Sequence, residues 1–287
     1  MQPKIIFAGA LQNSAEHLPA VFRNIEAISK LAAESAYIFV ENDSVDSTKS
    51  DLSSWGSRQS NFHLISLDGL NQISARTVRL ELIRNTYIEL IKQDSFLSDF
   101  DFLVVMDMDE VNIHPIDIQS FSNALNFLDG SSSRAAVFAN QQGAYYDMWA
   151  LRSKKLCSVD VWEEVLDYSH TYKVSDEQAF ASTFEKRILR ISSNQESIEV
   201  DSAFGGLGIY KMKFVLGNQN PYLGSKIKIL KNEEGQPHIL RTQICEHVHF
   251  HQGIRNQLGS LYIFPSLING VLPNTSFNPS FFRSLLF

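Results

Sequence analysis

Two aspartates follow a short apolar segment near the middle of the chain. Asp107 and Asp109 come directly after residues 102–106, which are all apolar. Residues two apart on an extended segment point to the same side, so both carboxylates can reach one ion. Carboxylate oxygens suit Mg²⁺ or Mn²⁺, and such ions commonly bridge protein oxygens to substrate phosphates. The pair predicts a metal and diphosphate site, although a solvated acidic loop would have the same sequence.

Histidines cluster near the end of the chain. Three of the eight, His247, His249 and His251, lie within one short segment. On a strand, all three would share one face, with Val248 and Phe250 on the other. Three imidazoles together favour ligand, catalytic or phosphate-contacting work for at least one of them, against purely structural histidines. We predict His247 as a metal ligand and His249 as the second choice of ligand or as a substrate contact.

A third group of polar side chains follows residues 37–40. Residues 41–48 contain Glu41, Asp43 and several further acidic or hydroxyl side chains. Short acceptors at the end of a strand can hydrogen-bond a ribose or a base. Turn and helix-cap chemistry explains the same residues equally well.

The elements that position these groups alternate along the first half of the chain. Strand-like and helix-like patterns succeed each other, which is typical of a mostly parallel sheet with helices on both faces. Ligands in such α/β sheets bind at the carboxyl ends of the strands. The predicted strands are 4–10, 37–40, 62–67 and 102–106, and the predicted helices are 18–31, a short one from Ser47 or Thr48, and 73–91.

The second half does not continue the regular alternation of strand-like and helix-like segments. It contains no repeat and no linker-like segment. We therefore predict one domain over residues 1–252, made of two halves at 1–112 and 113–252. Residues 253–287 are expected to be an apolar arm packed on the body, or else a membrane-surface or partner contact. Strands are predicted at 135–139, 145–151 and 198–212, a helix at 161–166, and a hairpin from 227–230 and 238–240.

Composition limits the function classes. The chain has 287 residues, 44% of them hydrophobic, and a formal net charge of -7, which argues against a general nucleic-acid binder. Cys157 and Cys245 are expected to be buried, reduced thiols. No signal peptide or membrane span is evident, so the predicted location is the cytoplasm or the inner face of a membrane. An acidic chain that binds a diphosphate near Asp107 and Asp109 needs a cation there, which favours metal dependence.

The ordered set of motifs resembles a known family. Residues 41–48, 82–85 and 105–110 resemble the nucleotide-sugar half of a GT-A fold glycosyltransferase. Residues 145–152 and 204–210 resemble segments of the fungal capsule alpha-mannosyltransferase family. Together these segments span about residues 3 to 252. The resemblance implies a Rossmann-like, mixed but mostly parallel sheet flanked by helices. It also implies that residues 1–112 bind the nucleotide sugar and that residues 113–252 bind the acceptor.

The resemblance also implies roles for individual residues. Asp107 and Asp109 would hold a Mn²⁺ or Mg²⁺ ion on the donor diphosphate, and His247 would complete the metal site. Gly205 and Gly206 would let the backbone approach a sugar closely. The nucleoside pocket would be lined by Ala8, Glu41 and Asp43, and Arg76 or Arg84 would face the phosphates.

The catalytic base is the least defined part of this assignment. No Glu-Asp base motif is evident, so inversion and retention both stay open. Asp201 and Glu246 are the candidate bases, and a structural role suits each of them as well. Tyr146 and Trp149, beside Tyr145, are candidates for a platform under a sugar ring, against ordinary core packing.

These features predict a metal-dependent hexosyltransferase. It would move a mannose-like or other hexose from a GDP- or UDP-sugar to a glycan or glycolipid acceptor in surface polysaccharide biosynthesis. One rival is a metal-dependent hydrolase that uses the three histidines with Asp107 or Asp109. A nucleotidyltransferase would need a basic residue in the loop at residues 8–13, which has none. A non-catalytic carbohydrate-binding protein of the same fold is the rival from another class.

Overall fold

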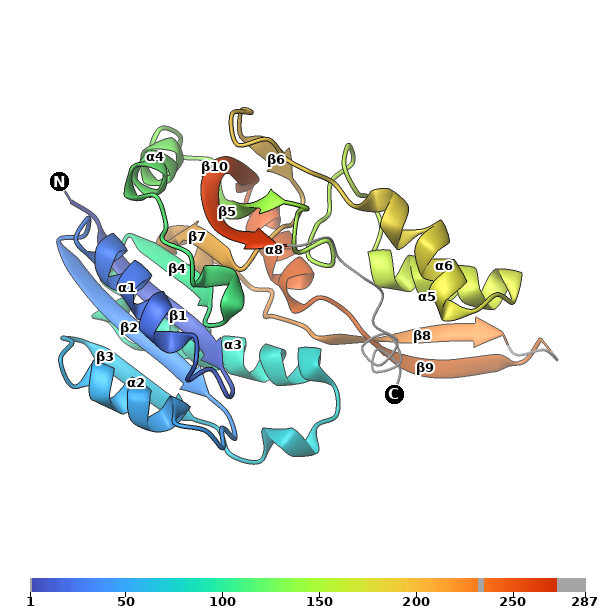
Figure 1. Cartoon of the computed structure of the whole chain (residues 1–287), viewed down its shortest axis with the longest axis horizontal. Coiled ribbons are helices and arrows are strands. Elements are labelled where there is room, and N and C mark those ends of the chain that lie inside the picture. The colour runs from blue at the N-terminus through green and yellow to red at the C-terminus, as the bar shows by residue number, and fades with distance from the viewer. Residues whose placement is uncertain (1, 232–234, 273–287) are drawn as a thin grey trace.

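Successive residues of the first strand are buried on opposite faces of one large sheet. Ile5 and Phe7 belong to one apolar cluster, and Ile6 and Ala8 belong to the other. The computed structural model describes residues 2–231 and 235–272 (Figure 1). Its eight-stranded sheet has the order β3-β2-β1-β4-β7-β5-β10-β6. The strands are β1 (Lys4–Leu11), β2 (Glu34–Glu41), β3 (Phe62–Ser66), β4 (Phe102–Asp107), β5 (Arg134–Gly143), β6 (Ile198–Val200), β7 (Leu207–Lys211) and β10 (Ser260–Leu272).

Helices cover both faces of this sheet. The helices α1 (Leu18–Ser29), α2 (Thr48–Gly56) and α4 (Ile118–Asp129) pack on the face that carries Phe7. The helices α3 (Arg76–Gln93) and α8 (Glu246–Asn256) pack on the face that carries Ala8. The remaining helices are α5 (Val161–Tyr172), α6 (Asp176–Ser182) and α7 (Met212–Leu216), with 3-10 turns at Leu70–Gln72, Leu97–Asp99, Glu110–Asn112 and Phe184–Arg187.

The strand directions bring the predicted site to one edge. The pairs β1 with β2, β1 with β4, β2 with β3, and β5 with β10 are parallel, while β7 runs antiparallel to β4 and β5. Ala10 lies opposite Asp107, and Leu11 lies opposite Glu41. The carboxyl ends of β1, β2 and β4 therefore meet, and the predicted mostly parallel α/β sheet is confirmed.

A separate hairpin extends from the sheet beside α5 (Figure 1). Its strands, β8 (Ser225–Lys231) and β9 (Pro237–Gln243), confirm the predicted hairpin. Lys226 and Lys228 both donate to Glu163 of α5, at 2.6 and 2.8 Å, and so hold the hairpin there.

Three predicted elements were wrong. The predicted strand at 198–212 is two strands, β6 and β7, which are not neighbours in the sheet. Residues 145–151 are not a strand, because β5 ends at Gly143 and a turn-rich segment follows it. The histidine cluster lies on the helix α8 and not on a strand. His247, Phe250, His251 and Ile254 are all buried, and their i, i+3, i+4, i+7 spacing is that of a helix face.

The C-terminal boundary also differs from the prediction. Residues 253–256 complete α8, and Ser260–Leu272 form β10 between β5 and β6 within the sheet. The arm predicted from residue 253 therefore begins too early, and its remainder, 273–287, lies outside the described residues. Cys157 and Cys245 are both buried and unpaired, as predicted. Among the described helices, none is both long and apolar enough to cross a bilayer.

Candidate active site

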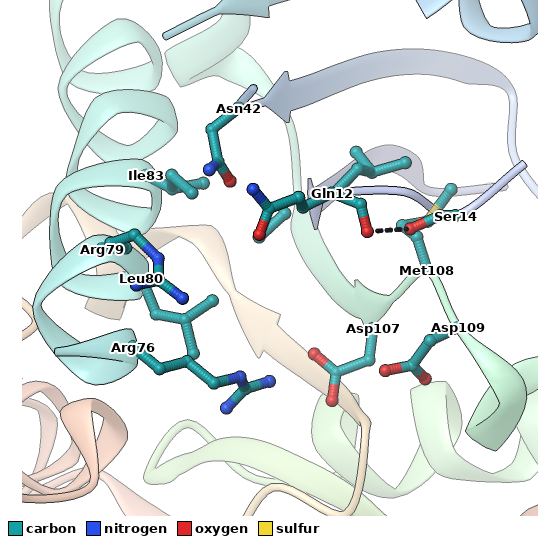
Figure 2. A pocket seen from close by; sticks show the side chains of 12 residues that line it. Gln12, Ser14, Asn42, Arg76, Arg79, Leu80, Ile83, Asp107, Met108 and Asp109 are labelled. Carbon is teal, nitrogen blue, oxygen red and sulfur yellow. Dashed lines mark hydrogen bonds between the residues drawn. The ribbon is translucent and has the colours of Figure 1, made fainter. Parts of the chain in front are cut away.

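Two adjoining cavities open at the carboxyl edge of β1, β2 and β4. The smaller, of about 170 Å³, lies between these strand ends and the start of α3 (Figure 2). The larger, of about 560 Å³, lies between α3, α8 and the segment after β5. Arg76, Leu80 and Asp107 line both cavities. The two cavities thus adjoin at these three residues, and together they form one cleft.

The Asp-x-Asp pair lies at this junction. Asp107 ends β4, and its carboxylate and that of Asp109 face the smaller cavity (Figure 2). The backbone N–H of Asp107 donates to Gly206 O at 2.9 Å, and Asn112 Nδ2 donates to Asp107 O at 2.8 Å. Burial, and then the charge of Asp109, raise the pKa of Asp107 to about 7. A cation between the two carboxylates would relieve this repulsion.

These residues fit a divalent ion in part. Two convergent carboxylates are suitable donors for Mn²⁺ or Mg²⁺. His247 is buried, both of its ring nitrogens lack a hydrogen-bond partner, and burial holds its pKa well below the usual value, so the imidazole is neutral. Within residues 2–231 and 235–272, however, no three His, Cys, Asp or Glu side chains are gathered closely enough to hold a metal. Asp107 and Asp109 could therefore hold the ion with phosphate oxygens, whereas His247 lies on the wall of the larger cavity.

Two arginines from the first turns of α3 line the smaller cavity. Arg76 extends toward Asp107, whereas Arg79 lies closer to the helix, where its Nη1 donates to Ile73 O at 2.6 Å (Figure 2). Burial, and then the charge of Arg76, lower the pKa of Arg79. An anion between the two guanidinium groups would be stabilised by both. Arg76 was predicted from the sequence and Arg79 was not, although residues three apart on a helix lie on the same face.

Arg84 does not face the cavity in the way that the resemblance implied. Its side chain is only 3% exposed and lies between two carboxylates. Arg84 Nε donates to Glu246 Oε1 at 2.9 Å, and Nη2 donates to Asp107 Oδ1 at 3.2 Å. Arg84 therefore positions Asp107, and Glu246 is held in a buried ion pair.

The residues predicted for the nucleoside pocket lie behind its wall. Ala8 is 1% exposed within the sheet. Glu41 Oε1 accepts from Ser44 N at 2.6 Å. Asp43 accepts from Gly69 N at 2.6 Å, and this bond lowers its pKa. None of the three lines the smaller cavity, whose polar wall near the strand ends is formed by Gln12, Ser14 and Asn42.

Aromatic side chains line the larger cavity. Tyr146, which is 42% exposed, and Trp149 lie on its wall, as a sugar platform would require. The wall also contains Trp162, Phe184 and Phe204, none of which the sequence analysis singled out.

Asp147 is a carboxylate of this cavity that the sequence analysis did not select. It lies between Tyr146 and Met148 and accepts from Ala150 N at 3.0 Å. Burial raises the pKa of Asp147 to about 6. The only signal in the sequence was an acidic residue within an aromatic segment.

Gly205 and Gly206 form a turn that contacts the backbone of Asp107. Their φ angles are +66° and +79°, which favour glycine. A Cβ on Gly206 would lie 2.5 Å from Val111 Cγ1, and one on Gly205 would lie 2.6 Å from Ala139 O. The glycines thus permit a left-handed turn and close packing. Neither glycine lines either cavity, so the structure does not place them beside a bound sugar as predicted. Their carbonyls accept from the buried side chains of Asn112, Gln141 and Asn269.

Three further predicted residues lie away from the cleft. Asp201 forms an ion pair with Arg255 at 2.6 Å and lines a separate cavity that shares no residue with the cleft. His249 Nδ1 lies 2.8 Å from Pro221 O. His251 is buried, and its two nitrogens contact the hydroxyls of Ser202 and Tyr210, at 2.8 and 2.9 Å. The three-histidine set of the hydrolase alternative is therefore not assembled.

Comparison with solved structures supports the fold. The crystal structure of residues 1–349 of S. aureus TarS aligns with a TM-score of 0.50 and 13% identity, over 93% of this chain and 60% of that one. Mannosyltransferase PcManGT from Pyrobaculum calidifontis aligns at 0.41 and 13%, over 75% and 46% of the two chains. Glucosyl-3-phosphoglycerate synthase from Mycobacterium tuberculosis aligns at 0.42 and 12%, over 97% and 74%. The last two scores are too low to add evidence.

No protein-family model and no curated protein sequence matches the chain. The chain spans about three fifths of the TarS structure that it matches. The resemblance to the fungal capsule family therefore stays a prediction. The eight-stranded mixed sheet and the likeness to TarS together show that the chain has the GT-A fold.

Proposed function

We propose that the chain is a metal-dependent glycosyltransferase that uses a nucleoside-diphosphate sugar. One observation carries the proposal. A carboxylate pair, Asp107 and Asp109, shares a polar cavity with Arg76 and Arg79, and Arg76 and Asp107 lie where this cavity joins an aromatic one. A diphosphate needs both cationic contacts and a cation on the acidic side, and a sugar ring suits an aromatic wall. The GT-A fold places this cleft at the carboxyl edge of its sheet.

In the donor half, the chain's own residues bind and orient the diphosphate. Arg76 and Arg79 would donate to its oxygens, and Asp107 and Asp109 would hold Mn²⁺ or Mg²⁺. When bound, the ion would neutralise charge that grows on the leaving diphosphate. Arg84 keeps Asp107 in place through the bond from its Nη2. The nucleobase of the donor would lie toward Gln12 and Asn42. Both GDP-sugars and UDP-sugars remain candidate donors.

In the acceptor half, aromatic side chains exclude water and present flat faces to a sugar. Tyr146 and Trp149 would contact the sugar, and Trp162 and Phe204 line the same cavity. We propose a hexose, mannose-like or other, as the transferred group. The acceptor would be a glycan or glycolipid, and surface polysaccharide synthesis would be its setting.

A thermal-shift panel of GDP- and UDP-sugars, each with and without Mn²⁺, tests the function. Selective, Mn²⁺-dependent stabilisation by one nucleotide is expected, because a ligand that binds only the folded state raises its melting temperature. Asp109→Asn should remove the Mn²⁺-dependent part, whereas Asp129→Asn, at the exposed end of α4, should not. If no nucleotide stabilises the chain, the proposal fails. Binding without any sugar transfer would instead favour a carbohydrate-binding protein.

A further inference from the structure

Four carboxylates line the aromatic cavity, and three of them are unsuited to accept a proton from a substrate. Asp107 and Glu246 are both ion-paired with Arg84. Glu110 is exposed to solvent in the turn after β4. Asp147 differs from these, because no Lys or Arg of the described residues forms an ion pair with it.

The backbone holds Asp147 in a fixed orientation. Its Oδ1 accepts from Ala150 N at 3.0 Å, and the backbone of Gly205 also favours its charged form. These contacts leave carboxylate lone pairs that no cation occupies, on the wall of a cavity large enough for a sugar. An acceptor ring on Tyr146 and Trp149 would present its hydroxyls at this wall.

The electrostatic surroundings are compatible with a proton acceptor. Burial raises the pKa of Asp147 to about 6, with a further contribution from the charge of Glu246. Such a carboxylate is ionised at neutral pH and holds a proton more readily than an exposed aspartate does. The other titratable groups on the wall of this cavity are Arg76, Arg84, Asp107, Glu110, Tyr146, Cys245, Glu246 and His247.

We infer that Asp147 is the catalytic base that takes the proton from the acceptor hydroxyl. The inference rests on the proposed glycosyltransferase function. As the O–H proton moves to the Asp147 carboxylate, the acceptor oxygen forms a bond to C1 of the donor sugar. The bond from C1 to the phosphate oxygen breaks, and its electron pair leaves with the diphosphate. A base on the acceptor side directs attack from the face opposite the leaving group, so the reaction inverts the anomeric configuration.

Asp147→Asn, Asp147→Glu and Asp129→Asn test this role. Release of nucleoside diphosphate from GDP-mannose and from UDP-glucose would be measured with Mn²⁺ and a mixture of methyl glycosides as acceptors. Removing a general base should lower kcat of Asp147→Asn by about 10²- to 10⁴-fold, with part of the rate retained in Asp147→Glu. Stabilisation by the donor should match that of the wild-type chain, because the donor half is intact. Asp129→Asn should behave as the wild-type chain.

The possible outcomes separate this inference from the proposed function. A wild-type chain that binds no donor and releases no diphosphate contradicts both. If Asp147→Asn binds the donor normally and keeps the wild-type kcat, the assignment of Asp147 as the base is wrong but the proposed function is not. A rise in acceptor KM with kcat unchanged would have the same meaning. The product's anomeric configuration, read by NMR, is a second measurement: inversion is expected, and retention would overturn the assignment.

Discussion

Replacing Asp147 by Asn should stabilise the folded chain at neutral pH. Burial raises the pKa of this carboxyl from 3.8 to about 6, so the folded state resists its ionisation. Between these two values the folded state holds a proton that the unfolded state has lost, and stability therefore falls as pH rises. Above about pH 6 the carboxyl is ionised in both states, and the loss of folding free energy is complete. Asn is close in shape, its oxygen can still accept from Ala150 N, and it carries no charge to desolvate.

The magnitude follows from the size of the pKa change. A shift of about 2 pH units at about 1.36 kcal/mol per unit corresponds to about 3 kcal/mol. Because Asp147 is half-buried and water screens part of its charge, a gain of about 1–3 kcal/mol is expected at pH 7.5. At about pH 3 the carboxyl is largely protonated in both states, and the difference should nearly vanish.

Urea unfolding of the wild-type chain and of Asp147→Asn at pH 4.5, 6 and 7.5 measures this directly. The expected result is a gain in unfolding free energy that grows with pH. Asp117→Asn is a control that should lower the free energy of unfolding at neutral pH. The hydrogen bond from Ser120 lowers the pKa of this N-cap carboxylate, so its charged form stabilises the fold. A loss of stability in Asp147→Asn at pH 7.5, or a difference independent of pH, would refute the environment assigned to this residue.

Three further substitutions test the rest of the cleft. Arg84→Met should destabilise the chain by about 3–5 kcal/mol in urea unfolding, because it leaves Asp107 and a second buried carboxylate without their cation. Gly206→Ala should cost about 1–3 kcal/mol in the same assay, since φ is +79° and the new Cβ would meet Val111; unchanged stability would contradict that geometry. Arg79→Gln should weaken nucleoside-diphosphate binding about tenfold in calorimetry, as the loss of a charged hydrogen bond implies.

The first half of the fold could be predicted because its local patterns agree with its tertiary structure. The first four strands are apolar segments that alternate with helices, and Asp107 ends the fourth of them. The last strand could not be recognised in this way. It contains Pro265 and Gly270, and its pairing with β5 has several register shifts. Proline and glycine within a segment ordinarily argue against a central strand.

The site could be predicted only where its residues lie close together in the sequence. The spacing of Asp107 and Asp109 was sufficient to place both at one cavity. The pairing of Arg84 with Glu246 joins residues 162 positions apart, and no local pattern indicates it. In sequence, the histidine segment fits a period of 2 as well as a period of 3.6. The joint burial of His247, Phe250, His251 and Ile254 in the structure distinguishes the two.

Titration calorimetry of GDP and UDP, with and without Mn²⁺, on the wild-type chain and Asp109→Asn tests whether a metal-dependent donor site lies at the end of β4. The account predicts that one nucleotide binds the wild-type chain much more tightly when Mn²⁺ is present, and that this gain is lost in Asp109→Asn. Equal affinity with and without the ion, or the same gain in the variant, would contradict a metal-dependent donor site at the end of β4.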